Sequence, residues 1–240
     1  MPSSLLDMNF LFDVDGTLTP SRERMDNKFR CFFGNWITKA RNRGNRVFIV
    51  TGSDKSKTIQ QVGVALWRHI SKDGCYQCSG NVFHKNNRVV RSSNWSMDDD
   101  LRSDVESLLK DSPWYGTATN NIEERTGAVN ISTIGRDCTT EQRKTYYEWD
   151  NDNKERDRIA SVLSFKYPHI HFLAGGEISI DIYPSGCDKS QVLSDMSGRN
   201  IFFGDKCIKP GNDYTIAIMS DIYYDVNGWE ETYNILRRAK

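Results

Sequence analysis

The sequence predicts an α/β fold in which a parallel sheet is split by an inserted α+β domain. Up to residue 70, short apolar runs alternate with helical segments, and this alternation is typical of a parallel sheet with helices between its strands. The pattern then changes to mixed strands and helices, and the first pattern resumes near residue 187. We therefore expect a core of residues 1–84 and 187–240 and an inserted domain of residues 85–186.

The first part of the core reads as strand, helix, strand, helix. Residues 8–14 and 46–50 are apolar runs that suit buried strands. Between them, residues 26–43 carry apolar side chains at helical spacing, and Gly44 suits the end of that helix. A second helix is expected where Ile59 to Ile70 place apolar residues on one face.

The inserted part lacks this alternation. Residues 82–90 read as a hairpin, and residues 98–110 as a helix. Alternating stretches lie near residues 117–123 and 128–134. A long helical region follows over residues 139–165, and residues 170–182 read as a further hairpin.

The last part returns to the core pattern. A helix is expected from Lys189, a buried strand over residues 200–203, and Asp205 directly after that strand. A polar loop covers residues 209–213. A last strand within 221–226 and a terminal helix with Trp229, Tyr233 and Leu236 on one face complete the prediction.

Composition excludes several classes of function. The chain has 240 residues, with 32 basic and 32 acidic side chains, which argues against a general affinity for nucleic acid or for anionic membranes. No apolar run is long enough to span a bilayer and no secretory leader is evident, so a cytoplasmic protein is expected. The six cysteines are too few for a disulfide scaffold, and Cys75 and Cys78 read as ordinary reduced thiols.

Two aspartates at the end of the first strand point to phosphoryl transfer. Asp13 and Asp15 are two residues apart, so on a strand both face one pocket. Paired carboxylates suit Mg²⁺, and one of them can attack phosphorus to form an aspartyl-phosphate. Gly16 allows a sharp turn that brings backbone N–H groups near a phosphate. The alternative for an isolated pair of this kind is an ordinary Asx turn.

Further polar groups follow the other core strands, where ligands bind in parallel sheets. Thr51, Gly52 and Ser53 offer hydroxyl and N–H groups to phosphoryl oxygens. Lys189 offers a cation that offsets the negative charge, and Asp205 offers another carboxylate to Mg²⁺. Each signal alone suits a turn or a solvated surface, but together they favour a phosphoryl-transfer site.

These motifs resemble those of a known family. The stretch of residues 10–19 is similar to the first motif of the haloacid dehalogenase superfamily. Residues 12–19, 130–143, 175–181, 188–189 and 202–213 are similar, more narrowly, to the eukaryotic-type phosphomannomutases. The resemblance implies a Rossmann-like haloacid dehalogenase core with a parallel sheet and an inserted α+β cap domain.

The resemblance also assigns roles. It implies that Asp13 is the nucleophile, that Asp15 is the general acid/base, and that Lys189 is the third catalytic residue. Asp13, Asp15 and Asp205 would hold Mg²⁺. Substrate contacts are implied for Arg22, Thr51, Gly52, Ser53, Arg125, Arg136, Arg143, Ser179 and Asp181.

The implied activity is interconversion of mannose 6-phosphate and mannose 1-phosphate. It would proceed through a phosphorylated Asp13 and a hexose 1,6-bisphosphate, which would also serve as activator. The partners implied are a phosphorylated hexose and a second copy of the chain, bound through the cap domain, with no nucleic acid and no membrane. The alternatives are a Mg²⁺-dependent sugar-phosphate phosphatase of the same superfamily and a non-catalytic sugar-phosphate sensor. Mannose or glucose preference stays open, as does a second cation site near residues 217–221.

Overall fold

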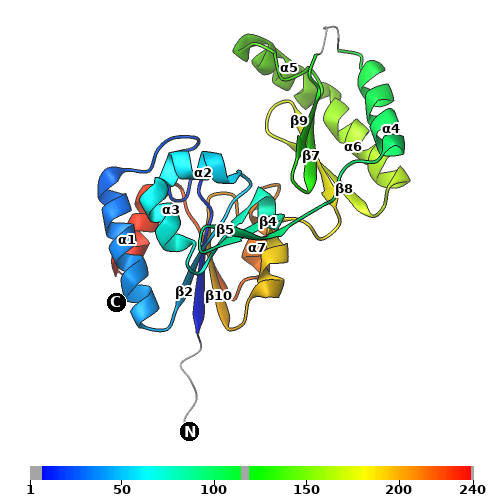
Figure 1. Cartoon of the computed structure of the whole chain (residues 1–240). Coiled ribbons are helices and arrows are strands. Elements are labelled where there is room, and N and C mark those ends of the chain that lie inside the picture. Colours follow the sequence, from blue (N-terminus) through cyan, green and yellow to red (C-terminus); the bar gives the residue numbers. More distant parts are fainter. Residues whose placement is uncertain (1–6, 115–118, 239–240) are drawn as a thin grey trace. The chain divides into compact units, whose positions relative to one another are not determined.

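The computed structural model describes residues 7–114 and 119–238, which form two compact units. The core unit consists of residues up to Ser92 together with those from Gly186 onwards. The cap unit is Ser93–Ser185. Figure 1 traces both along the chain.

The core unit contains a seven-stranded sheet in the order β11-β10-β1-β2-β3-β4-β5. Its strands are β1 (Met8–Phe12), β2 (Arg46–Val50), β3 (Gly74–Gln77), β4 (Val82–Lys85), β5 (Arg88–Ser92), β10 (Arg199–Gly204) and β11 (Ile222–Asp225). The strands from β11 to β3 pair in parallel, and β4 and β5 are antiparallel. Because β1 lies between β10 and β2, the residues that follow it reach the middle of the carboxyl edge, where parallel sheets bind ligands.

Helices cover both faces of the core sheet. On one face, α1 (Asn27–Asn42), α2 (Lys55–Val62), α3 (Val64–Ile70) and α8 (Trp229–Arg238) form a hydrophobic cluster that includes Phe12. On the other face, Leu11 belongs to a cluster with the helical segments after residue 188. These segments are η2 (Lys189–Asp195) and α7 (Tyr214–Met219). Because Leu11 and Phe12 point to opposite, covered faces, the strand carries apolar residues on both sides, with Asn9 as its polar residue.

Four features of the core differ from the sequence prediction. The single helix expected up to Ile70 is broken at Gly63, where φ is +87°. The helix expected from Lys189 is a 3₁₀ helix. The short strand β3 and the short helix α7 were not predicted, because Gly74–Gln77 contains no run of branched apolar residues and α7 directly follows a polar loop.

The first division between the units lies after Ser92, whereas the sequence placed it after residue 84. The difference is the strand β5, which pairs with β4 from Val82↔Ser92 to Lys85↔Arg88. This hairpin was expected from the sequence, but its pairing with β3 was not, and that pairing makes it part of the core sheet.

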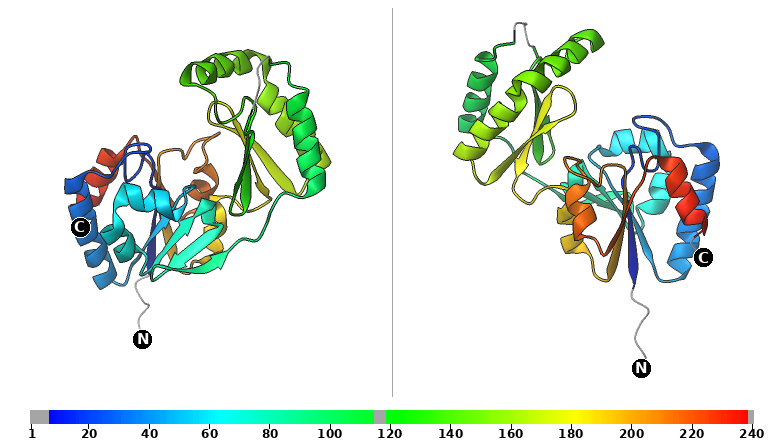
Figure 2. Two further views of the ribbon diagram at one scale, coloured as in Figure 1. Left: turned by 45° about the horizontal axis from the view of Figure 1, so that its top comes forward. Right: turned by 180° about the vertical axis from the view of Figure 1, so that it is seen from behind.

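The cap unit is an antiparallel sheet covered by helices. Its strands are β6 (Ile122–Arg125), β7 (Ala128–Ser132), β8 (Ile170–Gly175) and β9 (Ser179–Pro184), in the order β6-β7-β9-β8. On one face, α4 (Asp99–Lys110) and α6 (Glu155–Lys166) bury Val129, Ile131, Ile180 and Ile182 (Figure 2). The other face carries the alternate, polar side chains of the same strands.

Two cap predictions need adjustment. The long helix expected over residues 139–165 is divided into α5 (Thr140–Asn153) and α6 by Lys154, which has a left-handed backbone conformation with φ of +54°. Of the stretch expected near residues 117–123, residues 117 and 118 lie outside the described residues, and β6 begins at Ile122. Throughout residues 7–114 and 119–238, no helix has the length and apolar character needed to cross a membrane.

Candidate active site

A buried ion triad lies at the carboxyl end of β1. The backbone N–H of Asp13 donates to the Phe203 carbonyl at 2.9 Å, which continues the pairing of β1 with β10. The Lys189 ammonium lies 2.9 Å from Asp13 Oδ1 and 2.6 Å from Asp213 Oδ1. The side chains of Lys189, Asp13 and Asp213 are 1%, 5% and 0% exposed. An ammonium this deep is tolerated because two carboxylates compensate its charge.

The start of η2 directs Lys189 into this position. Asp188 caps η2 by accepting a hydrogen bond from the Ser190 N–H at 2.7 Å, so the chain turns inward at Lys189. Burial acts to lower the pKa of Lys189, but Asp13 and Asp213 outweigh it and raise the pKa. The lysine therefore remains a cation in the core.

The triad also sets the charge balance of Asp13. Burial raises its pKa, the Lys189 charge opposes that rise, and the Asp213 carboxylate adds to it. Since one ammonium faces two carboxylates here, the site carries an excess of negative charge that a further cation would offset.

Three carboxylates form a group suited to such a cation. Oxygen atoms of Asp13, Asp205 and Asp213 lie within 4.8 Å of one another. Asp213 Oδ2 is buried and has no hydrogen-bond partner among the described residues, so one oxygen of the group is left for a ligand. Oxygen donors of this kind fit Mg²⁺.

Two glycines leave room for these carboxylates. A Cβ on Gly16, where φ is +75°, would lie 2.2 Å from Asp205 Oδ2. A Cβ on Gly204 would lie 2.6 Å from Asp213 Oδ2. Both positions therefore require glycine for the acidic group to keep its place.

Asp213 was absent from the residues proposed from the sequence, and the structure brings it into the place that Asp15 was expected to share. Asp213 ends the loop before α7, and its backbone N–H donates to the Lys206 carbonyl at 3.2 Å. The sequence signal was the Asn-Asp pair of the loop at residues 209–213, but the burial of that aspartate depends on α7 and η2 packing together.

The carboxylate of Asp15 lies among hydrogen-bond donors instead. Its Oδ1 accepts from the Arg22 N–H at 2.6 Å and from Gln61 Nε2 at 2.8 Å. Its Oδ2 lies 3.5 Å from both Ser53 Oγ and Lys57 Nζ. Burial acts to raise the pKa of Asp15, but these hydrogen bonds and the Lys57 charge lower it below its usual range. Asp15 is thus held as an ionised carboxylate.

The Arg22 N–H reaches Asp15 because the backbone at Arg22 is left-handed, with φ of +62°. Few residues other than glycine adopt this conformation, and it is often found at functional sites. The Arg22 side chain itself is exposed and therefore open to a ligand.

The loop after β2 brings Ser53 to the same edge of the sheet. The Thr51 N–H donates to the Tyr76 carbonyl at 3.0 Å, and the Ser79 N–H donates to the Thr51 carbonyl at 2.9 Å. Thr51 is buried, whereas Gly52 is exposed and Ser53 is half-buried. The backbone hydrogen bonds of Thr51 therefore hold the loop in place, while the turn at Gly52 faces solvent.

A second group of predicted residues meets on the open face of the cap sheet. Register places Asn130 opposite both Glu123 and Asp181, so the three side chains share one face. Asn130 Nδ2 donates to Asp181 Oδ1 at 2.5 Å. Ser179 lies two residues before Asp181 on β9 and hence on the same face.

Arginines from three elements surround this group. Arg125 forms a bidentate pair with Glu123, with both N···O distances at 3.0 Å, and Arg136 Nη2 lies 2.8 Å from Glu123 Oε2. Arg143, on α5, lies 3.7 Å from Glu177 in the turn before β9. The hydrogen bond from Arg125 and the Arg136 charge lower the pKa of Glu123, although its burial opposes them.

A buried ion pair supports the turn that carries Glu177. Arg156 Nε donates to Asp150 Oδ2 at 2.7 Å, and both side chains are nearly inaccessible. The same guanidinium donates to the carbonyl oxygens of Gly175 and Gly176 at 3.3 and 2.9 Å. The turn between β8 and β9 is therefore anchored to the helical layer.

Similarity to known proteins agrees with this arrangement. A family model described as eukaryotic phosphomannomutase matches residues 33–239, which include Lys189, Asp205 and Asp213 but not Asp13. A phosphomannomutase of Nicotiana benthamiana is 35% identical over 86% of this chain and 83% of its own length. One of Encephalitozoon cuniculi is 32% identical over 96% of this chain and 92% of its own length.

The fold is shared more widely. A haloacid dehalogenase-like hydrolase from Bacteroides thetaiotaomicron matches with a TM-score of 0.61 at 11% identity, over 98% of this chain and 100% of that protein. The predicted α/β fold, with its mostly parallel core sheet and its inserted cap domain, is confirmed. The chain therefore belongs to the eukaryotic phosphomannomutase family.

Proposed function

We propose that this enzyme interconverts mannose 6-phosphate and mannose 1-phosphate through a phosphorylated Asp13. In one half of the cycle a sugar hydroxyl attacks the phosphorylated Asp13, the bond between phosphorus and Asp13 breaks, and the ionised Asp15 takes the hydroxyl proton, which gives a hexose bisphosphate. In the other half an oxygen of Asp13 attacks the phosphorus of the bisphosphate, the phosphorus–oxygen bond to the sugar breaks, and Asp15 returns the proton to the departing oxygen. A hexose 1,6-bisphosphate would be both intermediate and activator.

The remaining core residues have supporting roles in this proposal. Lys189 offsets charge on Asp13 and on the transferring group, and Thr51, Gly52, Ser53 and Arg22 bind phosphoryl oxygens. Asp13, Asp205 and Asp213 would hold Mg²⁺, which would supply positive charge beside the transferring phosphoryl group. Asp15 stays outside this set because its carboxylate is held by Arg22 and Gln61.

The observation that carries the mutase assignment is the arginine-rich open face of the cap sheet. A mutase must hold a second phosphate while the first reacts, and guanidinium groups suit this task because they bind phosphate through two parallel hydrogen bonds. We propose that Arg125, Arg136 and Arg143 bind that phosphate, and that Ser179 and Asp181 bind the sugar. Arg136 Nε is buried and unsatisfied among the described residues, which supports a missing ligand on this face.

A coupled assay tests the proposal. Mannose 1-phosphate with a catalytic amount of glucose 1,6-bisphosphate and Mg²⁺ is expected to yield mannose 6-phosphate faster than inorganic phosphate. The same assay with glucose 1-phosphate determines the sugar preference. A yield dominated by inorganic phosphate would establish the sugar-phosphate phosphatase instead, since water would then be the acceptor. Full turnover by Asp13→Asn would exclude every mechanism in which Asp13 is the nucleophile.

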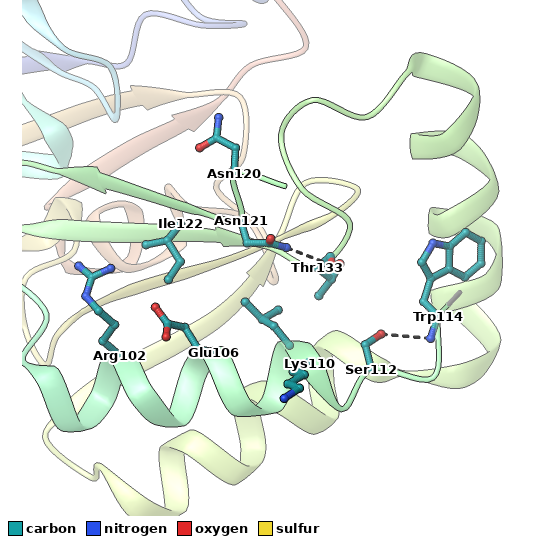
Figure 3. Close-up of a pocket in the computed structure, with 10 residues that line it drawn as sticks. Arg102, Glu106, Lys110, Ser112, Trp114, Asn120, Asn121, Ile122 and Thr133 are labelled. Carbon is teal, nitrogen blue, oxygen red and sulfur yellow. Dashed lines mark hydrogen bonds between the residues drawn. The ribbon is translucent and has the colours of Figure 1, made fainter. Parts of the chain in front are cut away.

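We also infer that two copies of the chain associate through the cap. The strand β6 is an edge of the cap sheet, and a groove of about 600 Å³ runs beside it, lined on one side by α4. Figure 3 shows Arg102 and Glu106 of α4 pointing toward Ile122 of β6 across this groove. Sedimentation is expected to give a dimer, and Ile122→Arg is expected to shift it to monomer. A wild-type monomer at all concentrations would refute the association.

A further inference from the structure

We propose that Gln61 is the positioning residue of the general acid/base, holding the Asp15 carboxylate in its working orientation. This inference rests on the proposed role of Asp15, and nothing in the motifs near Asp13 pointed to a glutamine on α2. Its foundation is one contact: Gln61 Nε2 donates to Asp15 Oδ1 at 2.8 Å.

Among the donors around Asp15, Gln61 is the buried and neutral side chain. Gln61 is 3% exposed, whereas Lys57 is 43% exposed and lies at 3.5 Å, where water screens its charge. Ser53 Oγ is equally distant, at 3.5 Å. A short hydrogen bond from a buried amide therefore does more than either of these to fix the rotation of the carboxylate.

Gln61 is itself held in place from two sides. The backbone carbonyl of Gln61 accepts a hydrogen bond from the Met25 N–H at 2.9 Å, which ties the end of α2 to the loop after β1. Its Nε2 also lies 3.2 Å from Thr19 Oγ1 in that loop. The helix ends one residue later, because Gly63 adopts φ of +87° and starts α3 in a new direction. The break lets Gln61 face the loop rather than a further turn of helix.

The amide of Gln61 also has an unused acceptor. Its Oε1 is buried without a hydrogen-bond partner among the described residues. A purely structural glutamine in a core normally satisfies both ends of its amide, because each unsatisfied end costs free energy. The Gln61 amide lies beside Asp15 although its Oε1 is left unsatisfied, and this points to a role in holding the Asp15 carboxylate.

The test compares two donors of the phosphoryl group. Acetate leaves acetyl phosphate as a stable anion and needs no proton, whereas the sugar oxygen of glucose 1,6-bisphosphate must be protonated as it leaves. In Gln61→Met, which keeps the length of the side chain and removes the N–H, phosphorylation of the enzyme by glucose 1,6-bisphosphate is expected to slow at least tenfold. Phosphorylation by acetyl phosphate is expected to stay within about twofold, since Asp13, Lys189 and the acidic group are untouched.

Gln60→Met is the matched control, because Gln60 is the exposed neighbour on the same helix. It should leave both rates unchanged. Equal losses with both donors in Gln61→Met would mean that the residue only supports the fold, and no loss with either would mean that it does not orient Asp15. Both results overturn the inference.

The wild-type enzyme separates this inference from the proposed function. If wild type forms only inorganic phosphate from mannose 1-phosphate, the mutase proposal fails. The ratio of the two phosphorylation rates in Gln61→Met still decides the role of Gln61, because a phosphatase protonates the same departing sugar oxygen.

Discussion

Replacing Gly16 by alanine tests the acidic group at the end of β1. The new Cβ would lie 2.2 Å from Asp205 Oδ2, and an ordinary contact begins at 3.4 Å, so the Asp205 carboxylate must withdraw by more than an ångström. Alanine at a positive φ also costs about 1–2 kcal/mol in the folded state. We therefore expect Gly16→Ala to lose both stability and one ligand of the proposed Mg²⁺ site.

The two losses can be separated by a control with the same backbone conformation. Gly44 has φ of +84°, and the nearest atom to its Cβ would be Asp7 Oδ1 at an ordinary 3.6 Å. Gly44→Ala should therefore show only the backbone cost in thermal unfolding without Mg²⁺. In calorimetric titration, Mg²⁺ should bind Gly16→Ala at least tenfold more weakly than wild type, a difference of about 1.4 kcal/mol, and bind Gly44→Ala normally.

The result that would refute the reasoning is a Gly16→Ala variant that binds Mg²⁺ as tightly as wild type. Asp205 would then be dispensable for the cation, and the close approach of Gly16 to its carboxylate would concern packing alone.

Two further predictions concern the cap. Arg156→Met leaves the buried Asp150 carboxylate without its partner and should lower the free energy of unfolding, measured in urea, by about 3–5 kcal/mol. Lys144→Met removes only an exposed pair with Glu148 and should change that free energy by about 0.5 kcal/mol or less. A small loss for Arg156→Met would contradict the anchoring role of its pair with Asp150. NMR titration should find the pKa of Glu123 below its usual 4.5, and this pKa should rise in Arg125→Met. The stabilising effect of the pairing is therefore complete above pH 4.5 and disappears as the pH falls through the lowered pKa. An unchanged pKa of Glu123 in Arg125→Met would refute the pairing as the cause.

The parts of the fold that sequence predicts best are the strands buried on both faces. The strands β1, β2 and β10 are apolar on both sides, so their runs stand out, and the motifs that follow them carry Asp13, Ser53 and Asp205. The break at Lys154 was not predictable, because a left-handed lysine leaves no signal in composition.

The acidic group of Asp13, Asp205 and Asp213 was predicted only in part, because tertiary packing leaves no local signal in the sequence. Spacing alone suggests that Asp13 and Asp15 share a pocket, but Asp15 is turned towards donors on α2, and α1 and β2 lie between β1 and α2 in the chain. Asp213 joins Asp13 and Asp205 because it lies 2.6 Å from Lys189, and this contact depends on the packing of α7 against η2. Gln61 had no local motif at all, and only its tertiary neighbours identify it.

The central position of β1 has a consequence for synthesis of the chain. Its partner β10 begins at Arg199, after the entire cap unit, so β1 is an unpaired edge on that side until residues 199–204 have been made. An apolar edge strand is open to pairing with other chains, and such species aggregate readily. The cap can complete its own sheet before β10 emerges, because all four of its strands precede Gly186. The cap can therefore fold before the core sheet is complete, and Asp13 gains its hydrogen bond to Phe203 only after β10 has been made.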